Sequence, residues 1–269
     1  AFKKAKRFEL TFERLGNDFY EKFISYLMND KKLLNNTIGG YIKVVKSFLN
    51  FATDKGYNKA SLEFKKYKVF KEEGELIYLT EEEVIKLLYF EKGMSNKLRS
   101  VRDNFCFACF TGLRYSDISI LKPENIKEDV LLIKTEKTRD FLQIPLNCYA
   151  KELLSKNSGH LPKLPSNQKT NDALKELGEL AGINEMVHIV KYRGVEKVEF
   201  LEPKHKFICT HTARRTFVTI CLEKGMRPEI VMSITGHKDY KTFKKYIKIT
   251  DKVKAVEMNK AWGAKMRIA

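Results

Sequence analysis

A break in sequence periodicity divides this 269-residue chain and limits the folds available to it. Before the break, residues 19–30 (FYEKFISYLMND) and 37–56 (TIGGYIKVVKSFLNFATDKG) carry apolar side chains at helical spacing. Residues 64–78 (FKKYKVFKEEGELIY) lose that spacing and mix charged residues with a glycine. Thr80 and Glu83 then start a new helix as a capping box ahead of VIKLLYF. The expected domains are a helical domain over residues 1–72, a linker over 73–78 and a second domain over 79–269.

The region after the break combines helical and strand patterns. Residues 96–112 (NKLRSVRDNFCFACFTG) are apolar enough for a buried helix, and Gly112 is placed to end it. Residues 130–146 (VLLIKTEKTRDFLQIPL) and 187–201 (VHIVKYRGVEKVEFL) each hold two β-rich runs around a turn, at Arg193-Gly194 in the second. Helical spacing returns from residue 209 to residue 262. These patterns predict a mainly α fold with short β-hairpins.

Charge points to the class of partner. The chain has 51 Lys and Arg against 34 Asp and Glu, a formal net charge of +17 at pH 7. This excess favours nucleic acid as the partner, ahead of an anionic membrane surface. No apolar run reaches the roughly 18 residues that a membrane span requires, and the opening FKKAKR does not resemble a signal peptide. We therefore expect no membrane association and no export.

Cysteine usage favours a reducing compartment. The five cysteines, at positions 106, 109, 148, 209 and 221, show no disulfide framework. Cys106 and Cys109 form one CxxC inside an apolar run, but no second CxxC or His-x-x-His completes a set of four metal ligands. We predict that both are buried core thiols on a helix.

Several kinds of cofactor chemistry lack their motifs. The sequence has no GxxxxGK[ST], no GxGxxG after a strand, no HExxH and no GxSxG. Its acidic residues lie mostly on charge-mixed helix surfaces rather than gathered as ligands for Mg²⁺. The sequence therefore predicts no cofactor and no metal.

Six residues of the second region suit phosphoryl transfer without a metal ion. HTARRTF places His211 and Arg214 three residues apart, on one face of a helix. Arginines can grip phosphate oxygens and neutralise the transition state, and a tyrosine can attack phosphorus if nearby cations stabilise its phenolate. Each residue taken singly also has an ordinary surface or core explanation. The other four residues are Arg114 in TGLR, Lys137 in the first hairpin, His237 in TGHK, and Tyr246.

The order Arg, Lys, His-x-x-Arg, Gly-His, Tyr resembles the tyrosine recombinases, also called the lambda-type phage integrase family. The neighbouring residues agree: TGLR is followed by YSDI, Lys-Thr lies in a hairpin that ends Ile-Pro-Leu, and TGHK precedes TFKKY. The resemblance extends from about residue 80 to the C-terminus and is nearest to integrases of conjugative transposons and related bacterial mobile elements. It implies a helical core-binding domain and a mixed α/β catalytic domain. The implied activity is site-specific DNA recombination without metal or ATP.

The resemblance also implies a role for each residue. Tyr246 would attack the scissile phosphate, form a 3′-phosphotyrosine and release a 5′-hydroxyl. Arg114 and Arg214 would clamp the phosphate. His211 and His237 would hydrogen-bond the same group, and His211 could also assist proton transfer. Some relatives carry Trp where this chain has His237, and both side chains are hydrogen-bond donors.

Lys137 would protonate the leaving 5′-oxygen. It is preferred over Lys134 because family members carry this lysine in a Lys-Thr pair a few residues before Ile/Val-Pro-Leu, and this sequence has Lys137-Thr138.

Further implications concern binding and assembly. The implied partner is double-stranded DNA at recombination sites, together with accessory DNA-bending proteins. The protein would be a homo-tetramer on paired sites and a monomer or dimer off DNA. The implied location is the bacterial cytoplasm, at the nucleoid. Residues 252–266 (KVKAVEMNKAWGAKM) suit a helix that docks on a neighbouring protomer or packs on its own domain. The chain lacks an initial Met, and the segment before Phe8 is too short for an arm-binding domain. We therefore expect either a short, simple recombinase or a protein with further sequence before residue 1. Candidate DNA contacts are Lys43, Lys46, Lys134, Arg139 and Arg215, the first two fitting a solvated helix face equally well.

Two other functions remain open. HTARRTFVTICLEKGMRPEIVMSITGHKDYKTF can form a helix–turn–helix, with Gly225 in the turn and Pro228 opening the second helix. The chain could then be a non-catalytic DNA-binding regulator in which Tyr246 is structural. Phosphotyrosine chemistry without exchange between partner sites would instead make it a relaxing enzyme resembling type IB topoisomerases.

Overall fold

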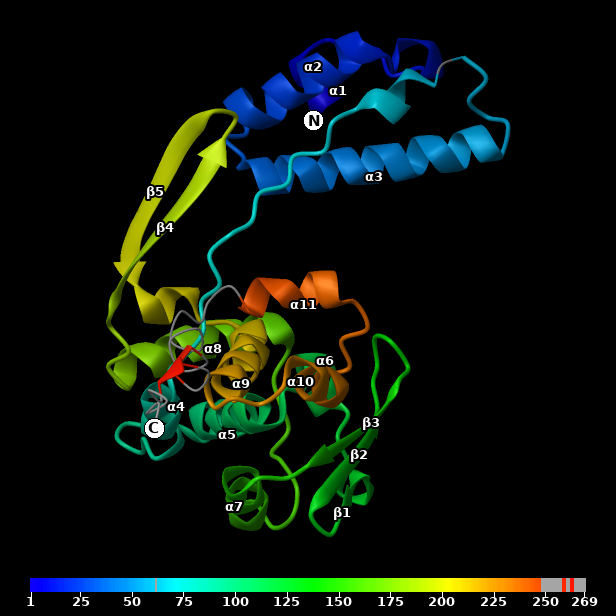
Figure 1. The fold of residues 1–269 in the computed structure, drawn as a ribbon. Helices are drawn as coiled ribbons and strands as arrows, with labels where there is room; N and C mark the ends of the chain where they lie inside the picture. The colour runs from blue at the N-terminus through cyan, green and yellow to red at the C-terminus, as the bar shows by residue number, and fades with distance from the viewer. Residues whose placement is uncertain (61, 248–257, 260–261, 264–269) are drawn as a thin grey trace, which may run out of the picture. The chain divides into compact units, whose positions relative to one another are not determined.

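Residues 1–60, 62–247, 258–259 and 262–263 are described by the computed structural model of this protein. The chain divides into two compact units (Figure 1). The first comprises residues 1–75 and 187–201, and the second comprises residues 76–186 and 202–269. The docking helix expected over residues 252–266 lies outside the described residues, apart from 258–259 and 262–263.

Helices of the first unit pack around an aromatic core. Their bounds are α1 (Phe2–Ala5), α2 (Asn17–Ser25) and α3 (Asn35–Asp54), with a π-helical turn at Tyr26–Asp30 and 3₁₀ turns at Phe12–Arg14 and Glu63–Lys66. Phe2, Phe8 and Phe19 are buried with ring centroids 5.6–5.7 Å apart, a spacing at which aromatic rings attract one another beyond simple burial. The long α3 ends two residues before Gly56, which takes a φ of +75° as a helix-ending glycine does.

A β-hairpin from later in the chain completes the first unit. Strands β4 (Met186–Arg193) and β5 (Glu196–Pro203) form a two-stranded sheet that turns at Gly194. The buried Asn35 binds both backbone groups of this turn. The Asn35 side-chain nitrogen donates to the Gly194 carbonyl at 2.8 Å, and the Gly194 N–H donates to the Asn35 side-chain oxygen at 2.6 Å.

The sequence predicts this hairpin but groups it with residues 79–269. Its contacts instead group residues 187–201 with the first unit. The alternating pattern of a strand is local, whereas Asn35 and Gly194 are 159 residues apart, so the sequence pattern carried no sign of this pairing. The division into domains at 1–72, 73–78 and 79–269 otherwise stays a prediction.

The second unit is built mainly of helices around the buried α5. The bounds are α4 (Glu81–Leu88), α5 (Asn96–Thr111), α6 (Tyr115–Ser119), α7 (Cys148–Lys156), α8 (Asn167–Leu180), α9 (Thr210–Glu223), α10 (Pro228–Thr235) and α11 (Tyr240–Ile247), with 3₁₀ turns at Pro123–Asn125 and Lys204–Phe207. Helix α5 contacts α4, α7, α8 and α9. The predicted capping box begins α4: the Thr80 hydroxyl accepts from the Glu83 N–H, and the Glu83 carboxylate accepts from the Thr80 N–H.

A small antiparallel sheet lies beside these helices (Figure 1). Its strands β1 (Ile126–Lys127), β2 (Val130–Lys134) and β3 (Phe141–Pro145) pair in that order. Leu131 faces Ile144 and Ile133 faces Leu142, and all four side chains are buried. Because alternate residues of a strand point to one face, this register buries one side of the hairpin and leaves residues 135–140 as its connecting loop.

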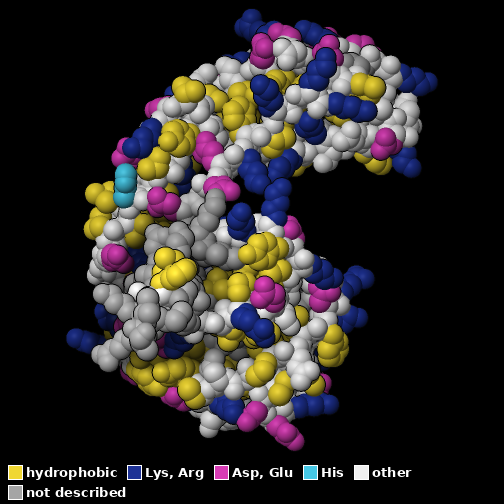
Figure 2. Space-filling view, in the orientation of Figure 1, with side chains coloured by type: hydrophobic (Ala, Val, Ile, Leu, Met, Phe, Trp, Pro, Cys, Tyr) yellow, Lys and Arg dark blue, Asp and Glu magenta, His cyan; other side chains and the backbone are white. Residues whose placement is uncertain are grey.

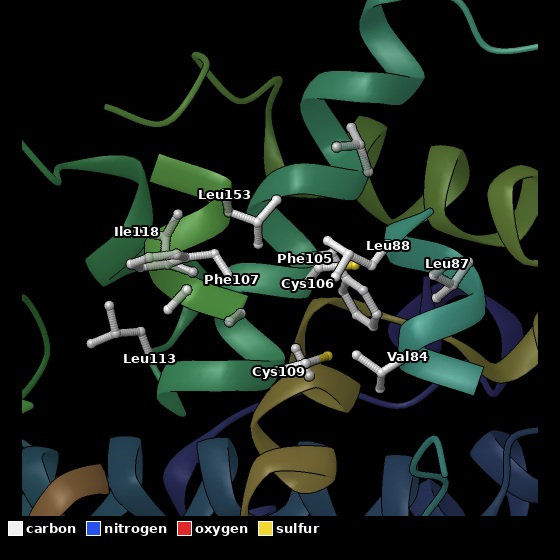
Figure 3. Packing of buried hydrophobic residues seen from close by; sticks show 14 of the residues in the cluster. Val84, Leu87, Leu88, Phe105, Cys106, Phe107, Cys109, Leu113, Ile118 and Leu153 are labelled. Atoms are coloured by element: carbon white, nitrogen blue, oxygen red, sulfur yellow. The ribbon is translucent and has the colours of Figure 1, made fainter. Parts of the chain in front are cut away.

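The CxxC pair lies in the core of the second unit (Figure 3). Cys106 and Cys109 are both buried on α5. Burial raises the pKa of the Cys106 thiol to about 12 and also raises the pKa of the Cys109 thiol. The prediction of buried core thiols is confirmed. Among the described residues, no group of three or more His, Cys, Asp and Glu side chains could hold a metal ion.

Basic side chains are distributed over both units. Lys and Arg are spread across the visible face of each unit, with Asp and Glu among them (Figure 2). No helix in the described part of the chain is long and apolar enough to cross a membrane.

Candidate active site

The end of α5 brings a backbone carbonyl into the candidate site. Gly112 takes a φ of +71° and ends the helix, as predicted. A Cβ at this position would lie 2.6 Å from the Phe217 ring and 2.8 Å from the Thr235 methyl group, so the packing leaves room only for glycine. This close approach allows the Gly112 carbonyl to accept a hydrogen bond of 2.9 Å from Arg214 Nη1.

We expect Gly112→Ala to lower the free energy of unfolding by about 3 kcal/mol. Positive φ costs a residue other than glycine roughly 1–2 kcal/mol, and overpacking against Phe217 and Thr235 adds about 1–3 kcal/mol. Gly93→Ala is the matched control, because Gly93 also has a φ of +71° but a Cβ added there would meet no atom within 4 Å. Urea unfolding followed by circular dichroism measures both, and equal destabilisation would contradict the packing argument.

Arg214 lies at the centre of the candidate site. It is 1% exposed on α9, where Nη1 donates to the Gly112 carbonyl and Nη2 donates to the Thr235 carbonyl. Nη2 also lies 3.3 and 3.4 Å from the two ring nitrogens of His237. Burial, followed by the nearby Arg114, lowers the pKa of Arg214 to about 10, so its guanidinium remains charged at neutral pH. Two cations held close together in a desolvated site favour binding of an anion.

Arg114 directly precedes α6 and is held there by Asp117. Asp117 is 0% exposed, its Oδ2 accepts from the Arg114 N–H at 3.4 Å, and Oδ2 lies 3.8 Å from Arg114 Nη1. Within the described residues, Nη1 is buried and has no hydrogen-bond partner. A buried N–H without a partner is costly, and a phosphate oxygen would supply the missing acceptor.

An open pocket of about 280 Å³ joins Arg114, His211 and Arg214. His211 comes from the first turn of α9, one helical turn before Arg214, which accounts for their shared pocket. Partial desolvation, then the charges of Arg215 and Arg214, lower the pKa of His211 to about 4, so the imidazole is neutral at pH 7. The remaining residues that line the pocket are Tyr115, Ser116, Asn167 and Thr210.

A glycine turn directs His237 back toward Arg214. Helix α10 ends at Gly236, which takes a φ of +65°, and the His237 N–H then donates to the Met232 carbonyl at 3.0 Å. His237 Nδ1 lies 2.7 Å from the Thr235 hydroxyl. Burial, followed by the charges of Arg214 and then Arg114, lowers the pKa of His237 to about 3.

Tyr246 packs against His237 from α11. Its side chain is 1% exposed, and its ring centroid lies 5.8 Å from that of His237 and 5.8 Å from that of Phe243. Burial raises the pKa of Tyr246, whereas the charges of Arg214 and other nearby arginines oppose this rise. The hydroxyl is therefore protonated at neutral pH in the free protein.

Lys137 lies on the exposed loop between β2 and β3. Two interactions tie this loop to the rest of the site. Asp117 Oδ1 accepts a hydrogen bond of 3.0 Å from the Glu136 N–H, and Asp140 forms an ion pair of 2.7 Å with Lys238, the residue after His237. Asp117 thereby connects the turn of Arg114 to the loop of Lys137.

The structure brings five of the six predicted site residues together. Arg114, His211 and Arg214 share the pocket, while His237 contacts Arg214 and Tyr246. The sixth residue, Lys137, reaches this group only through its tethered loop. The catalytic roles of all six stay predictions.

The predicted DNA contacts have different surroundings. Lys43 and Lys134 are exposed, as is Arg139, which takes a φ of +56°. Lys46 donates to the carbonyls of residues 65 and 67 at 2.8 and 2.9 Å, so its ammonium already stabilises the fold of the first unit. Arg215 is half-buried next to Arg214, and its Nε is buried without a partner among the described residues.

Sequence reasoning missed two residues that hold the site together. Asp117 and Thr235 are buried polar residues that contact Arg114 and Arg214, respectively. Both belong to motifs that the sequence reasoning used, TGLRYSDI and TGHK, but it assigned neither residue a role. An acidic residue three positions after Arg114 was the available sequence signal for Asp117, whereas Thr235 had none.

The chain belongs to the phage integrase family, the lambda-type tyrosine recombinases. The model of that family matches residues 78–252, and the phage integrase SAM-like domain matches residues 1–69. A tyrosine recombinase of Pseudothermotoga lettingae is 26% identical over 186 residues, which cover 68% of this chain and 60% of that protein. The match therefore spans less than two thirds of that relative's length.

Solved structures share the fold at low sequence identity. A lambda integrase dimer bound to a core site has a TM-score of 0.66 at 16% identity, covering 91% of this chain and 85% of that chain. The XerH recombinase bound to palindromic difH has a TM-score of 0.67 at 15% identity, covering 96% of this chain and 76% of that chain. The integrase of the Tn1549 transposon with transposon right end DNA has a TM-score of 0.65 at 17% identity, covering 98% of this chain and 90% of that chain.

Proposed function

We propose that this protein is a site-specific DNA recombinase that cleaves and rejoins DNA through a 3′-phosphotyrosine. Tyr246 attacks the scissile phosphate and the 5′-hydroxyl leaves. The phosphotyrosine conserves the energy of the phosphodiester bond, so rejoining to a new 5′-hydroxyl requires neither ATP nor a metal ion. The observation that carries the proposal is the contact of Tyr246 with His237 and of His237 with Arg214, in a chain of the phage integrase family.

Arg114 and Arg214 bind the phosphate in this proposal. Negative charge spreads over the pentacoordinate phosphorus in the transition state, and guanidinium groups stabilise it more strongly in a desolvated site than in water. The repulsion between the two arginines in the free protein, which contributes to the lowered pKa of Arg214, is relieved when the anionic phosphate binds.

Proton transfers accompany both bond changes. The Tyr246 hydroxyl must lose its proton as it attacks, and the neutral His211 in the adjoining pocket is able to accept one. The leaving 5′-oxygen must gain a proton, which we assign to Lys137 on the tethered loop. The protons therefore balance over one cleavage step, and rejoining reverses them.

We expect Lys137→Ala to slow cleavage by about 10²–10⁴-fold, the usual contribution of a general acid. A substrate in which sulfur replaces the 5′-bridging oxygen has a better leaving group that needs no proton, so its cleavage should be nearly normal in the variant. Lys134→Ala, on the strand just before the loop, is the matched control; because Lys134 is itself a candidate DNA contact, both variants are measured at saturating DNA. Single-turnover rates on both substrates test the assignment, which a failure of sulfur to rescue Lys137→Ala would refute.

The proposed partner is double-stranded DNA that carries recombination sites. The net charge of +17 supports duplex binding, because the phosphates supply much of the affinity of such complexes. Strand exchange between two sites requires four protomers, so we propose a tetramer on DNA and a monomer or dimer off it, with DNA-bending proteins as accessories. The likeness to a transposon integrase supports a mobile element of bacteria, and hence action at the nucleoid.

Covalent trapping tests the proposal directly. Labelled suicide DNA from the ends of the native element is incubated with the protein in EDTA and run on a denaturing gel. A shifted adduct is the expected result. Tight DNA binding without an adduct would support the non-catalytic regulator, and relaxation of plasmids that lack a specific site would support the topoisomerase-like enzyme.

A further inference from the structure

Thr235 contacts both Arg214 and His237. Its carbonyl accepts a hydrogen bond from Arg214 Nη2, and its hydroxyl lies 2.7 Å from His237 Nδ1. The residue is 1% exposed, so bulk water does not replace these contacts. The hydroxyl of Thr235 therefore influences which ring nitrogen of His237 carries a hydrogen.

The hydrogen positions follow from counting donors and acceptors. The Thr235 hydroxyl has one hydrogen and lies 2.6 Å from the Val231 carbonyl, which can only accept. If that hydrogen is donated to Val231, the hydroxyl can only accept from His237, so Nδ1 carries the hydrogen. Arg214 Nη2, which can only donate, then has Nε2 as its acceptor on the ring, at 3.4 Å. The opposite arrangement would place two lone pairs against each other at 2.6 Å.

His237 carries a single hydrogen at neutral pH. Burial and the surrounding cations lower its pKa to about 3, so the ring is neutral at pH 7. With the hydrogen on Nδ1, the Nε2 atom has a lone pair and cannot donate to a phosphate oxygen. The groups that face the ring are Arg214 and His211 from α9, Arg114 before α6, and Lys245 and Tyr246 from α11.

We propose that Thr235 is a positioning residue that sets the tautomer of His237. In the free protein its hydroxyl donates to Val231 and holds the imidazole hydrogen on Nδ1. When a phosphate binds, a charge-assisted hydrogen bond from Nε2–H to a phosphate oxygen, stronger than a neutral one, offsets the loss of the hydroxyl's bond to Val231. The hydroxyl then turns to donate to Nδ1, and the hydrogen is carried on Nε2. The ring remains neutral in both states, so no proton is gained or lost overall. This inference rests on the proposed function, because it gives His237 a phosphate to bind.

Two substitutions distinguish the effect of the Thr235 hydroxyl from the effect of the packing of its side chain. Thr235→Val keeps the branched shape that packs near Gly112 and removes the hydroxyl, whereas Thr235→Ser keeps the hydroxyl and removes the methyl group. If the residue acts through packing alone, the serine variant is the more damaged of the two. If the residue acts through its hydroxyl, Thr235→Val is the more damaged variant.

Nitrogen-15 NMR of the imidazole rings reads the tautomer in the free protein, and His237→Gln assigns the signals. We expect the Nδ1–H form in the wild type and in Thr235→Ser, and a mixture of tautomers in Thr235→Val. Titration with inorganic phosphate, against chloride at equal ionic strength, should shift the wild type and Thr235→Ser toward the Nε2–H form. An Nε2–H ring in the free wild type, or an unchanged ring in Thr235→Val, would overturn the proposal.

Adduct formation provides the functional comparison. We expect Thr235→Val to form adducts about five- to tenfold more slowly, as the loss of one hydrogen bond predicts, and Thr235→Ser to stay within about twofold of the wild type. The reverse order would show that packing, and not the hydroxyl, matters. If the wild type forms no adduct while the NMR result is as expected, the recombinase function fails and the tautomer assignment stands.

Discussion

Tyr246→Phe is expected to abolish covalent protein–DNA adducts while DNA binding is retained. The substitution removes only the hydroxyl oxygen that would bond to phosphorus, and the ring keeps its packing against His237 and Phe243. Loss of a nucleophile lowers the rate by at least about 10⁴-fold in enzymes that use one. Denaturing gels measure the adduct, and a mobility-shift assay on the same DNA measures binding.

Tyr240→Phe supplies the matched control for this experiment. Tyr240 opens the same helix, α11, but its side chain is 51% exposed, and the ring contacts of His237 among the described residues are with Phe243 and Tyr246. Adduct formation should therefore be unchanged in Tyr240→Phe. Adducts that persist in Tyr246→Phe would remove Tyr246 as the nucleophile, and loss of adducts in both variants would indicate that α11 as a whole had been disturbed.

Arg214→Lys is expected to reduce cleavage by about 10²–10³-fold, a loss typical of removing one group that stabilises charge in a transition state. Lysine keeps the positive charge but lacks the planar fork of the guanidinium. It cannot reach the carbonyls of Gly112 and Thr235 and present a donor to the phosphate at the same time. Single-turnover cleavage at saturating DNA measures the loss, and urea unfolding should show destabilisation of about 1–3 kcal/mol.

Arg215→Lys distinguishes this effect from a general change of charge. Arg215 is the next residue of α9 and is half-buried, yet neither of the two carbonyls is bound by it in the described structure. We expect its substitution to cost less than about tenfold in cleavage and to leave stability nearly unchanged. Equal losses of cleavage rate in Arg214→Lys and Arg215→Lys would contradict the proposal that the guanidinium of Arg214 binds the phosphate.

Local patterns in the sequence predicted most of the fold. The capping box at Thr80 and the helix end at Gly112 depend on residues within a few positions of one another, and the hairpin over residues 130–146 on two β-rich runs around a polar turn. The order of the six basic and tyrosine residues, with its resemblance to a known family, pointed to the site. The structure then placed five of them in contact or around one pocket.

The contacts that organise the site could not be predicted in the same way. Arg214 binds the Gly112 carbonyl from 102 residues away and the Thr235 carbonyl from 21 residues away. Backbone carbonyls have no signature in a sequence, because every residue has one. The DNA contact expected at Lys46 shows the same difficulty, since its ammonium binds the carbonyls of residues 65 and 67.

The pair of hydrogen bonds between Asn35 and Gly194 has a consequence for synthesis of the protein. Asn35 is made early, but the glycine it binds follows 159 residues later, after most of the second unit has been translated. The first unit therefore cannot finish folding as its own residues leave the ribosome. The chain also passes between the units three times, after residues 75, 186 and 201, so a single cut in the linker would leave two strands of the first unit on the other fragment.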